Sequence, residues 1–300
     1  MITIRKQKTK IGLFDIVNGF LMIAMMFVMV YPFWNTIAVS LNDATDGIKG
    51  GIYFWPRVFT FYNYVSLFDT NNLINAFFIS LSKTVLVTLL NVFFSAMAGY
   101  ILSRKEFCLR KALSLFLIAT MYVNAGLFPQ YFNYRDLGLI NNYLVYIWPN
   151  ILGVFNVIVI RTFIDQLPDS FAESAKIDGA GDFRIFVQII MPLCKPVLAT
   201  VALWVAVGAW NEWFDTYMFA SSKQALSTLQ FEMMKMLSSS MTQSGVRVPG
   251  LVQQSGQNGM VTPTSIRAAI TVVAALPIIF VYPFMQRYFI AGLHIGGVKG

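Results

Sequence analysis

Six stretches of this chain stay apolar over about 20 residues, the length that a helix needs to cross the hydrocarbon core of a bilayer. They are Leu13–Leu41, Phe77–Ser103, Ala112–Tyr134, Tyr143–Ile164, Pro196–Ala220 and Ile266–Ile290. Hydrophobic residues make up 57% of the chain and charged residues only 12%, about half the charge of an ordinary soluble domain. The sequence therefore predicts an all-α, polytopic membrane protein with six transmembrane helices.

Basic residues outnumber acidic ones, 22 to 14, which could suggest nucleic-acid binding. No basic run interleaved with aromatic residues follows the first ten positions, so we expect no nucleic-acid partner. With the N-terminus placed inside, 14 Lys and Arg residues fall on cytoplasmic segments and 6 on outer segments. Cytoplasmic loops are enriched in Lys and Arg, so both termini are predicted to be cytoplasmic.

This topology divides the chain into parts. We expect a cytoplasmic N-terminus (1–12), a first transmembrane helix with an outer loop (13–76), a core of helices two to six (77–290) and a cytoplasmic tail (291–300). The core includes a cytoplasmic loop (165–195) and an outer loop (221–265). The outer loop is rich in Gly, Ser and Gln, which suits either a flexible connector or an arm that reaches a partner.

The chain lacks the sequence motifs of several classes of enzyme. The chain has no G-x4-G-K-[ST] phosphate loop, no H-E-x-x-H motif and no G-x-S-x-G motif. The two cysteines, Cys108 and Cys194, are too few for a disulfide framework, and the one histidine, His294, offers no His-based metal site. We therefore predict no catalytic residues, no metal site and no enzyme activity on this chain.

The cytoplasmic loop predicts a helix–turn–helix. Ser170 and Glu173 have the spacing of a capping box that starts a short helix, which Gly179 and Gly181 would end. Asp182 would cap a second helix that Pro192 terminates. The alanines of this loop would leave a shallow contact surface of small residues; they are Ala172, Ala175 and Ala180. From spacing alone, an amphipathic hairpin lying on lipid is equally compatible.

The same loop resembles a motif of permease subunits of ABC importers, E-A-A-x3-G-x9-I-x-L-P. The chain has Glu173-Ser174-Ala175, then Gly179, Ile189 and Met191-Pro192, with the same spacing. Ser174 and Met191 depart from the motif, both with a mild change of size. The resemblance implies a type I importer permease fold and a coupling helix that contacts the ATPase subunit. The implied coupling residues are Glu173, Ser174, Ala175, Asp178, Gly179 and Ala180.

Other segments extend the resemblance in family order. Trp55–Phe68 and Gly99–Lys111 are similar to segments of carbohydrate-importer permeases. Trp210–Asp215 and Leu276–Gly300 resemble the smaller maltose-type permease. Asn124–Asn150 is similar to an oligosaccharide branch that includes permeases of alginate importers.

The resemblance implies an ATP-driven complex in the inner membrane that works by alternating access. Its other members would be a second homologous permease, two ATP-binding subunits and an extracytoplasmic solute-binding protein, with a carbohydrate as substrate and lipid around it. This chain would carry no cofactor, while ATP and Mg would bind the partner ATPase subunits. The alternatives are an ion-coupled secondary transporter, which would show inverted halves with broken spans, and a membrane enzyme, which would show paired catalytic groups.

Polar residues inside the predicted spans are costly in lipid and so are candidates for function. The asparagines could bond neighbouring helices or, with stacking aromatics, line a path for a sugar. These path candidates are Asn91, Tyr122, Asn124, Asn156, Trp210 and Asn211. Lys83 and Glu212 lie at similar depth with opposite charge, so we expect them to form an intramembrane ion pair.

Overall fold

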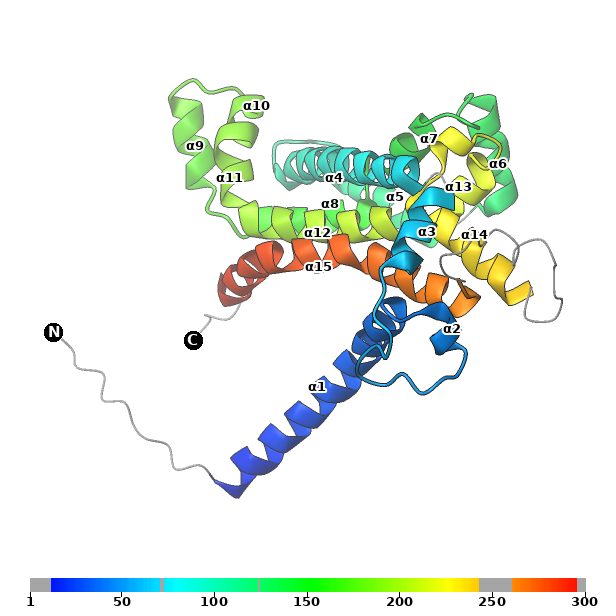
Figure 1. The fold of residues 1–300 in the computed structure, drawn as a ribbon. Helices are drawn as coiled ribbons and strands as arrows, with labels where there is room; N and C mark the ends of the chain where they lie inside the picture. Colours follow the sequence, from blue (N-terminus) through cyan, green and yellow to red (C-terminus); the bar gives the residue numbers. More distant parts are fainter. Residues whose placement is uncertain (1–11, 71–72, 124, 243–260, 296–300) are drawn as a thin grey trace. The chain divides into compact units, whose positions relative to one another are not determined.

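The computed structural model describes residues 12–70, 73–123, 125–242 and 261–295. The described residues form helices and contain no β-strand, only an isolated bridge between Asn42 and Phe59 (Figure 1). They divide into two compact units, one with residues 12–70 and 261–273 and the other with residues 73–123, 125–242 and 274–295. The all-α prediction is confirmed.

The first unit contains a long helix followed by a short, folded segment. Helix α1 (Leu13–Ser40) exposes large apolar side chains along most of its length. Helices α2 (Ala44–Gly47) and α3 (Tyr62–Thr70) follow, and the beginning of α15 (Pro263–Ile295) belongs to the same unit. Side chains as apolar as those of α1 require lipid or a protein neighbour around them.

The second unit is organised around α4 (Leu73–Ser103), which packs against α8 (Val154–Ile164) and α12 (Lys195–Asn211) (Figure 1). Gly99 permits the close approach of α4 and α8, because a Cβ atom there would lie 3.2 Å from the Val157 carbonyl oxygen and the Arg161 nitrogen. The remaining elements of this unit are α5 (Arg110–Tyr122), α6 (Leu127–Asp136), α7 (Leu144–Ile147), η1 (Trp148–Asn150), α9 (Ser170–Ile177), α10 (Asp182–Ile185), the π-helix η2 (Phe186–Ile190), α11 (Met191–Leu193), α13 (Phe214–Phe219), η3 (Gln224–Leu226) and α14 (Leu229–Thr242).

Three helices of the described chain are long and apolar enough to cross a membrane, and they are α1, α4 and the part of α15 up to Pro283. Three further pairs pass the same criterion jointly but are bent, α5 with α6, α7–η1 with α8, and α10–α11 with α12. The predicted third span, Ala112–Tyr134, is thus two helices, and Gly126, with φ +87°, precedes the second. The predicted fifth span is also divided, since α12 ends at Asn211 before α13 begins.

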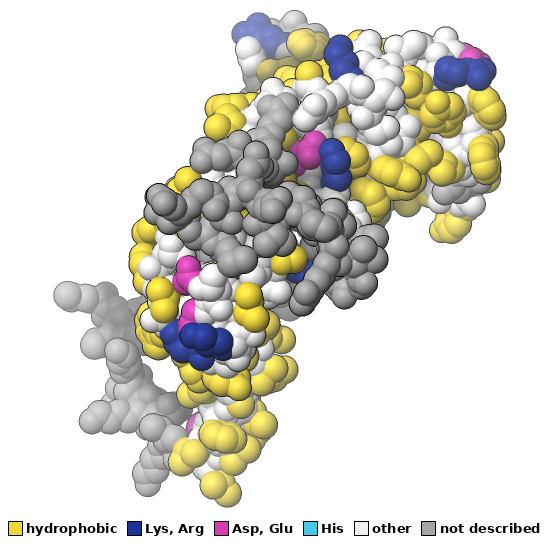
Figure 2. Space-filling view, turned by 45° about the vertical axis from the view of Figure 1, so that its right-hand side comes forward, with side chains coloured by type: hydrophobic (Ala, Val, Ile, Leu, Met, Phe, Trp, Pro, Cys, Tyr) yellow, Lys and Arg dark blue, Asp and Glu magenta, His cyan; other side chains and the backbone are white. Residues whose placement is uncertain are grey.

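Two apolar cores hold the second unit together. The larger joins α4, α8, α9, η2 and α12 through residues such as Tyr100, Ile160 and Phe186. The smaller surrounds Tyr146 and Phe219 near α7 and α13. On the face shown in Figure 2, hydrophobic side chains are widespread and charged side chains are confined to small groups. Such a surface is typical of a protein solvated largely by lipid.

Candidate functional site

Helix α9 is closed by a tight, glycine-dependent turn. Gly179 has φ +79°, a left-handed conformation in which a side chain would be strained. The backbone N–H of Gly179 bonds the Lys176 carbonyl, and that of Ala180 bonds the Ala175 carbonyl at 2.9 Å. These bonds satisfy carbonyls at the end of α9 and turn the chain toward α10.

The six residues expected to contact an ATPase do not all face the same way. Four are exposed, and they are Glu173, Ser174, Asp178 and Gly179. Ala180 is half-buried, whereas Ala175 is buried in the larger core with Ala172. The expected contact surface of small residues is therefore wrong for Ala172 and Ala175, because these alanines let α9 lie close to its own bundle.

Large apolar side chains occupy the exposed face of this loop instead. Ile177 is 87% exposed, Phe183 66% and Phe171 45%. Side chains of this size seldom remain fully in water on a short loop, and a cluster of them is typical of a protein or membrane contact. The exposed face of α9 and α10 therefore combines polar groups with apolar anchors.

Ion pairs connect α9 to the turn after α4. The Lys105 ammonium lies 2.8 Å from the Asp169 carboxylate, and the Lys176 ammonium lies 2.7 Å from that of Glu106. The hydrogen bond from Lys105 lowers the pKa of Asp169, and the one from Lys176 lowers the pKa of Glu106. Both pairs are exposed, so they orient the loop more than they stabilise it.

The expected caps of the two short helices are not formed. Asp169 occupies the N-cap position of α9 without a side-chain cap, because its carboxylate is bonded to Lys105. The residue before the second helix is Gly181 rather than Asp182, and the helix continues as a π-helix and a short α11 through Pro192. This helical stretch ends at Leu193, one residue after Pro192, and the chain then bends toward α12, so the predicted end lies close to the observed one.

Two predicted path residues bond each other. The Asn156 amide donates to the Asn91 side-chain oxygen at 2.8 Å, and the Asn91 amide donates to the Asn150 carbonyl at 2.7 Å. Asn91 is buried, and the Ser95 hydroxyl adds a further bond at 3.3 Å. This network connects α4 to η1 and α8, so these amides serve as interhelical bonds.

The other candidates for the substrate path differ in burial and in hydrogen-bond partners. Trp210 is buried, and its indole N–H donates to the Ala274 carbonyl at 3.1 Å. Asn211 is exposed and accepts a bond from the Gln230 amide at 3.2 Å. Tyr122 is 85% exposed, and Asn124 lies outside the described residues.

Lys83 and Glu212 do meet, but through the main chain of Glu212. The Lys83 ammonium donates to the Glu212 carbonyl oxygen at 3.1 Å and lies 4.9 Å from the centre of the Tyr146 ring. The Glu212 carboxylate instead accepts the backbone N–H of Phe214 at 2.8 Å and of Asp215 at 3.3 Å. The contact differs from the expected ion pair because this carboxylate caps the first turn of α13.

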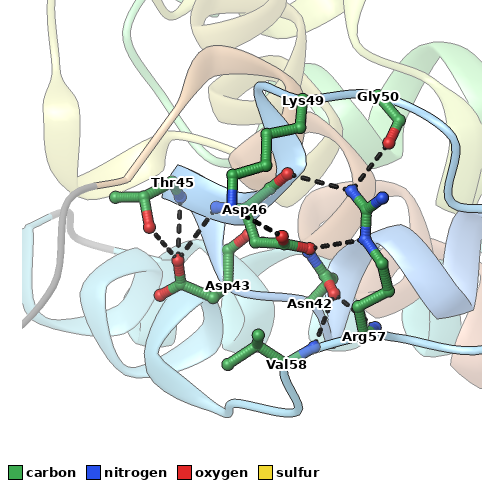
Figure 3. A network of polar contacts seen from close by, with 8 residues as sticks. All are labelled: Asn42, Asp43, Thr45, Asp46, Lys49, Gly50, Arg57 and Val58. Carbon is green, nitrogen blue, oxygen red and sulfur yellow. Dashed lines mark hydrogen bonds and ion pairs between the residues drawn. The ribbon is translucent and has the colours of Figure 1, made fainter.

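A polar network that the sequence reasoning missed shapes residues 42–59, here called the α2 segment (Figure 3). The buried Asn42 accepts the backbone N–H groups of Arg57 at 2.7 Å and Val58 at 3.1 Å. The Arg57 guanidinium pairs with the buried Asp46 at 2.8 Å, and this hydrogen bond lowers the pKa of Asp46. Asp43 caps α2 by accepting the backbone N–H of Asp46. The sequence signal was the Asn-Asp pair before a short helix, a typical N-cap.

Within the part of the chain that the structure describes, no three His, Cys, Asp or Glu side chains are placed to hold a metal ion.

Comparison with known proteins assigns the chain to a family. The family of binding-protein-dependent transport system inner membrane components matches residues 97–294, which include α9–α11. The chain is 32% identical over 291 residues to the polygalacturonan/rhamnogalacturonan transport system permease protein YtcP of Bacillus subtilis (strain 168), covering 96% of this chain and 99% of that protein. It is 33% identical over 297 residues to the protein LplC of the same organism, covering 98% of each.

A solved structure agrees with the sequence relatives. A chain in the crystal structure of a bacterial ABC transporter involved in the import of the acidic polysaccharide alginate matches with a TM-score of 0.80 and 25% identity, covering 92% of this chain and 96% of that one. The chain is thus a multi-pass permease component rather than an enzyme. It belongs to the family of binding-protein-dependent transport system inner membrane components.

Proposed function

We propose that this chain is a permease subunit of an ATP-driven importer that moves an oligosaccharide into the cytoplasm by alternating access. The family match and the transport names of the relatives support this function. A polygalacturonan/rhamnogalacturonan permease and an importer of the acidic polysaccharide alginate both favour a substrate with carboxylate groups. We therefore propose an acidic oligosaccharide as the substrate.

The complex would contain partners that this chain implies by its family. They are a second homologous permease, two ATP-binding subunits that bind ATP and Mg, and a solute-binding protein that delivers the sugar from outside. We propose that both termini and the α9–α11 loop lie in the cytoplasm, as the distribution of Lys and Arg favours.

We propose that α9 is the coupling helix and that its exposed face enters a groove of the ATPase subunit. The single observation that carries this proposal is the division of α9 into two faces. Ala172 and Ala175 are buried against the bundle, while Ile177 is 87% exposed directly beside them. A force on Ile177 would thus pass to α4, η2 and α12 through packed side chains rather than through a flexible link.

For the substrate path we propose Asn211 and Tyr122 as contributors. Both are exposed in this chain, and a second permease could face them across a shared cavity. Asn91 and Asn156 already bond each other, so we assign them to helix packing instead.

The coupling role is tested with Ile177→Asp in the reconstituted importer. The charge should prevent insertion of α9 into an apolar groove, so ATPase activity stimulated by the sugar-loaded binding protein should fall to the basal level, about tenfold or more. Ile177→Leu is the matched control and should retain stimulation. Normal stimulation in Ile177→Asp, with the variant present in the membrane at its usual amount, would contradict the coupling role.

The substrate class needs a separate measurement. Purified importer in vesicles should take up short galacturonides or alginate oligomers and should leave neutral malto-oligosaccharides of the same length outside. Uptake of the neutral series alone would overturn the acidic substrate while leaving the permease function intact.

A further inference from the structure

A basic cavity lies beside α9, between the end of α4, the beginning of α5 and the end of α8. Its volume is about 290 Å³, and its charged lining groups come from four basic and two acidic residues. They are Arg104, Lys105, Arg110, Arg161, Asp165 and Asp169. The interhelical bonds and the proposed coupling surface described above do not account for this concentration of positive charge.

Ion pairs within the cavity neutralise only half of the basic groups. Lys105 pairs with Asp169 at 2.8 Å, and Arg161 pairs with Asp165 at 3.5 Å. Arg161 also donates to the Ser114 hydroxyl at 2.6 Å. The two acidic groups are therefore already engaged, and the cavity retains the charge of two arginines.

Those two arginines have no carboxylate within ion-pair distance among the described residues. The Arg104 guanidinium lies over the Tyr100 ring at 4.4 Å, and its enclosed Nε has no hydrogen-bond partner in this part of the chain. Arg104 lines the cavity, and an anion held there would offset its uncompensated charge. Arg110 begins α5 and is half-buried at the same cavity.

We propose that this cavity binds a phosphate oxyanion between Arg104 and Arg110. Arginine binds phosphate through parallel N–H donors in a planar fork, which suits a half-enclosed site better than a single point charge does. The chain is a membrane protein, so the phosphate can belong to an anionic lipid headgroup or to a free phosphate. Bound there, the anion would connect the α4–α5 turn to the link before α9.

The test uses the full-length chain purified in mild detergent together with the subunits that accompany it. Native mass spectrometry would count bound phosphatidylglycerol, with phosphatidylcholine as the neutral lipid, and calorimetry would measure inorganic phosphate. We expect the combined variant Arg104→Gln and Arg110→Gln to bind the preferred anion at least about tenfold more weakly than the unmodified chain. Arg135→Gln is the control, since Arg135 is an exposed arginine on α6 next to Asp136.

The possible outcomes distinguish a lipid headgroup, a free phosphate and a protein contact. Arginine-dependent retention of phosphatidylglycerol identifies a lipid headgroup, and arginine-dependent binding of inorganic phosphate alone identifies a free anion. Binding of neither probe, or equal binding by the control and the combined variant, overturns the proposal. Loss of an accompanying ATPase with unchanged anion binding also overturns it, because the arginines would then serve a protein contact. Arg110→Gln alone, checked for a monodisperse elution profile, covers the case in which the combined variant does not fold.

Discussion

The α2 segment and the α9–α11 loop are both short stretches outside the long helices, yet they are held in opposite ways. The α2 segment has polar groups inside, with Asn42 and Asp46 buried, and exposes aromatic side chains such as Trp55. The α9–α11 loop has alanines and Phe186 inside and carries its ion pairs on the exposed side. The conformation of the α2 segment depends on buried hydrogen bonds, whereas that of the α9–α11 loop depends on the size of the side chains packed against the bundle.

This difference determines which kind of substitution each region tolerates. A buried network fails when one donor or acceptor is lost, because its partner is then left unsatisfied. A packed alanine contact fails when volume is added, because the helix must move away from its bundle. Adding volume at a packed alanine and removing an acceptor from the polar network therefore test the comparison directly.

The largest effect is expected from Ala175→Leu. Added volume at a buried alanine should cost about 1–3 kcal/mol and displace α9 from the bundle, so transport should be lost. Thermal unfolding and ATPase stimulation of the reconstituted complex measure the two consequences. Ser174→Leu adds the same side chain at the exposed neighbour and should leave the unfolding temperature unchanged. Equal destabilisation by both variants would show that α9 is not held by close packing.

The next effect is expected from Asn42→Ala. The backbone N–H groups of Arg57 and Val58 would lose their acceptor, at a cost of about 1 kcal/mol for each bond, because both bonds are only partly buried and water can replace the acceptor. Limited proteolysis should then cut residues 48–58 faster. Thr45→Ala removes an exposed contact to Asp43 in the same segment and should change the cleavage rate far less. An unchanged rate in Asn42→Ala would mean that the network does not fix this segment.

A smaller effect is expected from acid. The hydrogen bond from Arg57 lowers the pKa of Asp46, so its stabilising contribution is present above the ordinary carboxyl pKa, about 4. That contribution is lost as the pH falls through the lowered value in the folded protein. Hydrogen exchange of residues 42–58 should therefore accelerate below about pH 4. In Asp46→Asn, this acid-dependent acceleration should disappear, and its persistence would assign the effect to another group.

The smallest effect is expected from Lys105→Gln, which removes the exposed pair with Asp169. Solvent screens such pairs, so the unfolding temperature should not change measurably. A large loss of stability would contradict the assignment of α9 stability to its buried alanines.

The sequence predicted the long transmembrane helices better than the breaks within the other spans. Apolar length alone predicted α1 and α4 within a few residues, because nothing competes with a helix in lipid. It could not predict the division of Ala112–Tyr134, since Gly126 and the backbone around it break the helix without interrupting the apolar run. Part of the predicted outer loop 221–265 is helical, as α14, and its centre lies outside the described residues.

At the site, motif spacing located α9 but not the direction of its side chains. A spacing of three residues places Ala172 and Ala175 on the same face of the helix, yet only the packed bundle decides that this face is turned inward. The capping box of Ser170 and Glu173 is not formed, because Ser170 is already the first residue of α9 and the N-cap is Asp169. The Asp169 carboxylate binds Lys105, 64 positions away, instead of capping the helix. A local sequence pattern does not predict contacts between distant parts of the chain.

The bend between α11 and α12 has a mechanical consequence. Residues Asp182–Leu193 form an arm set at 83° to α12, with the bend at Cys194, and 12 helical residues span about 18 Å. Because the arm is nearly perpendicular to α12, its far end moves when α12 rotates about its own axis. A rotation of about 10° displaces that end by about 3 Å, given an arm of about 18 Å. A small turn of one helix inside the bundle is thus amplified into a displacement at its surface, and a push of a few ångströms at that surface turns the helix in return.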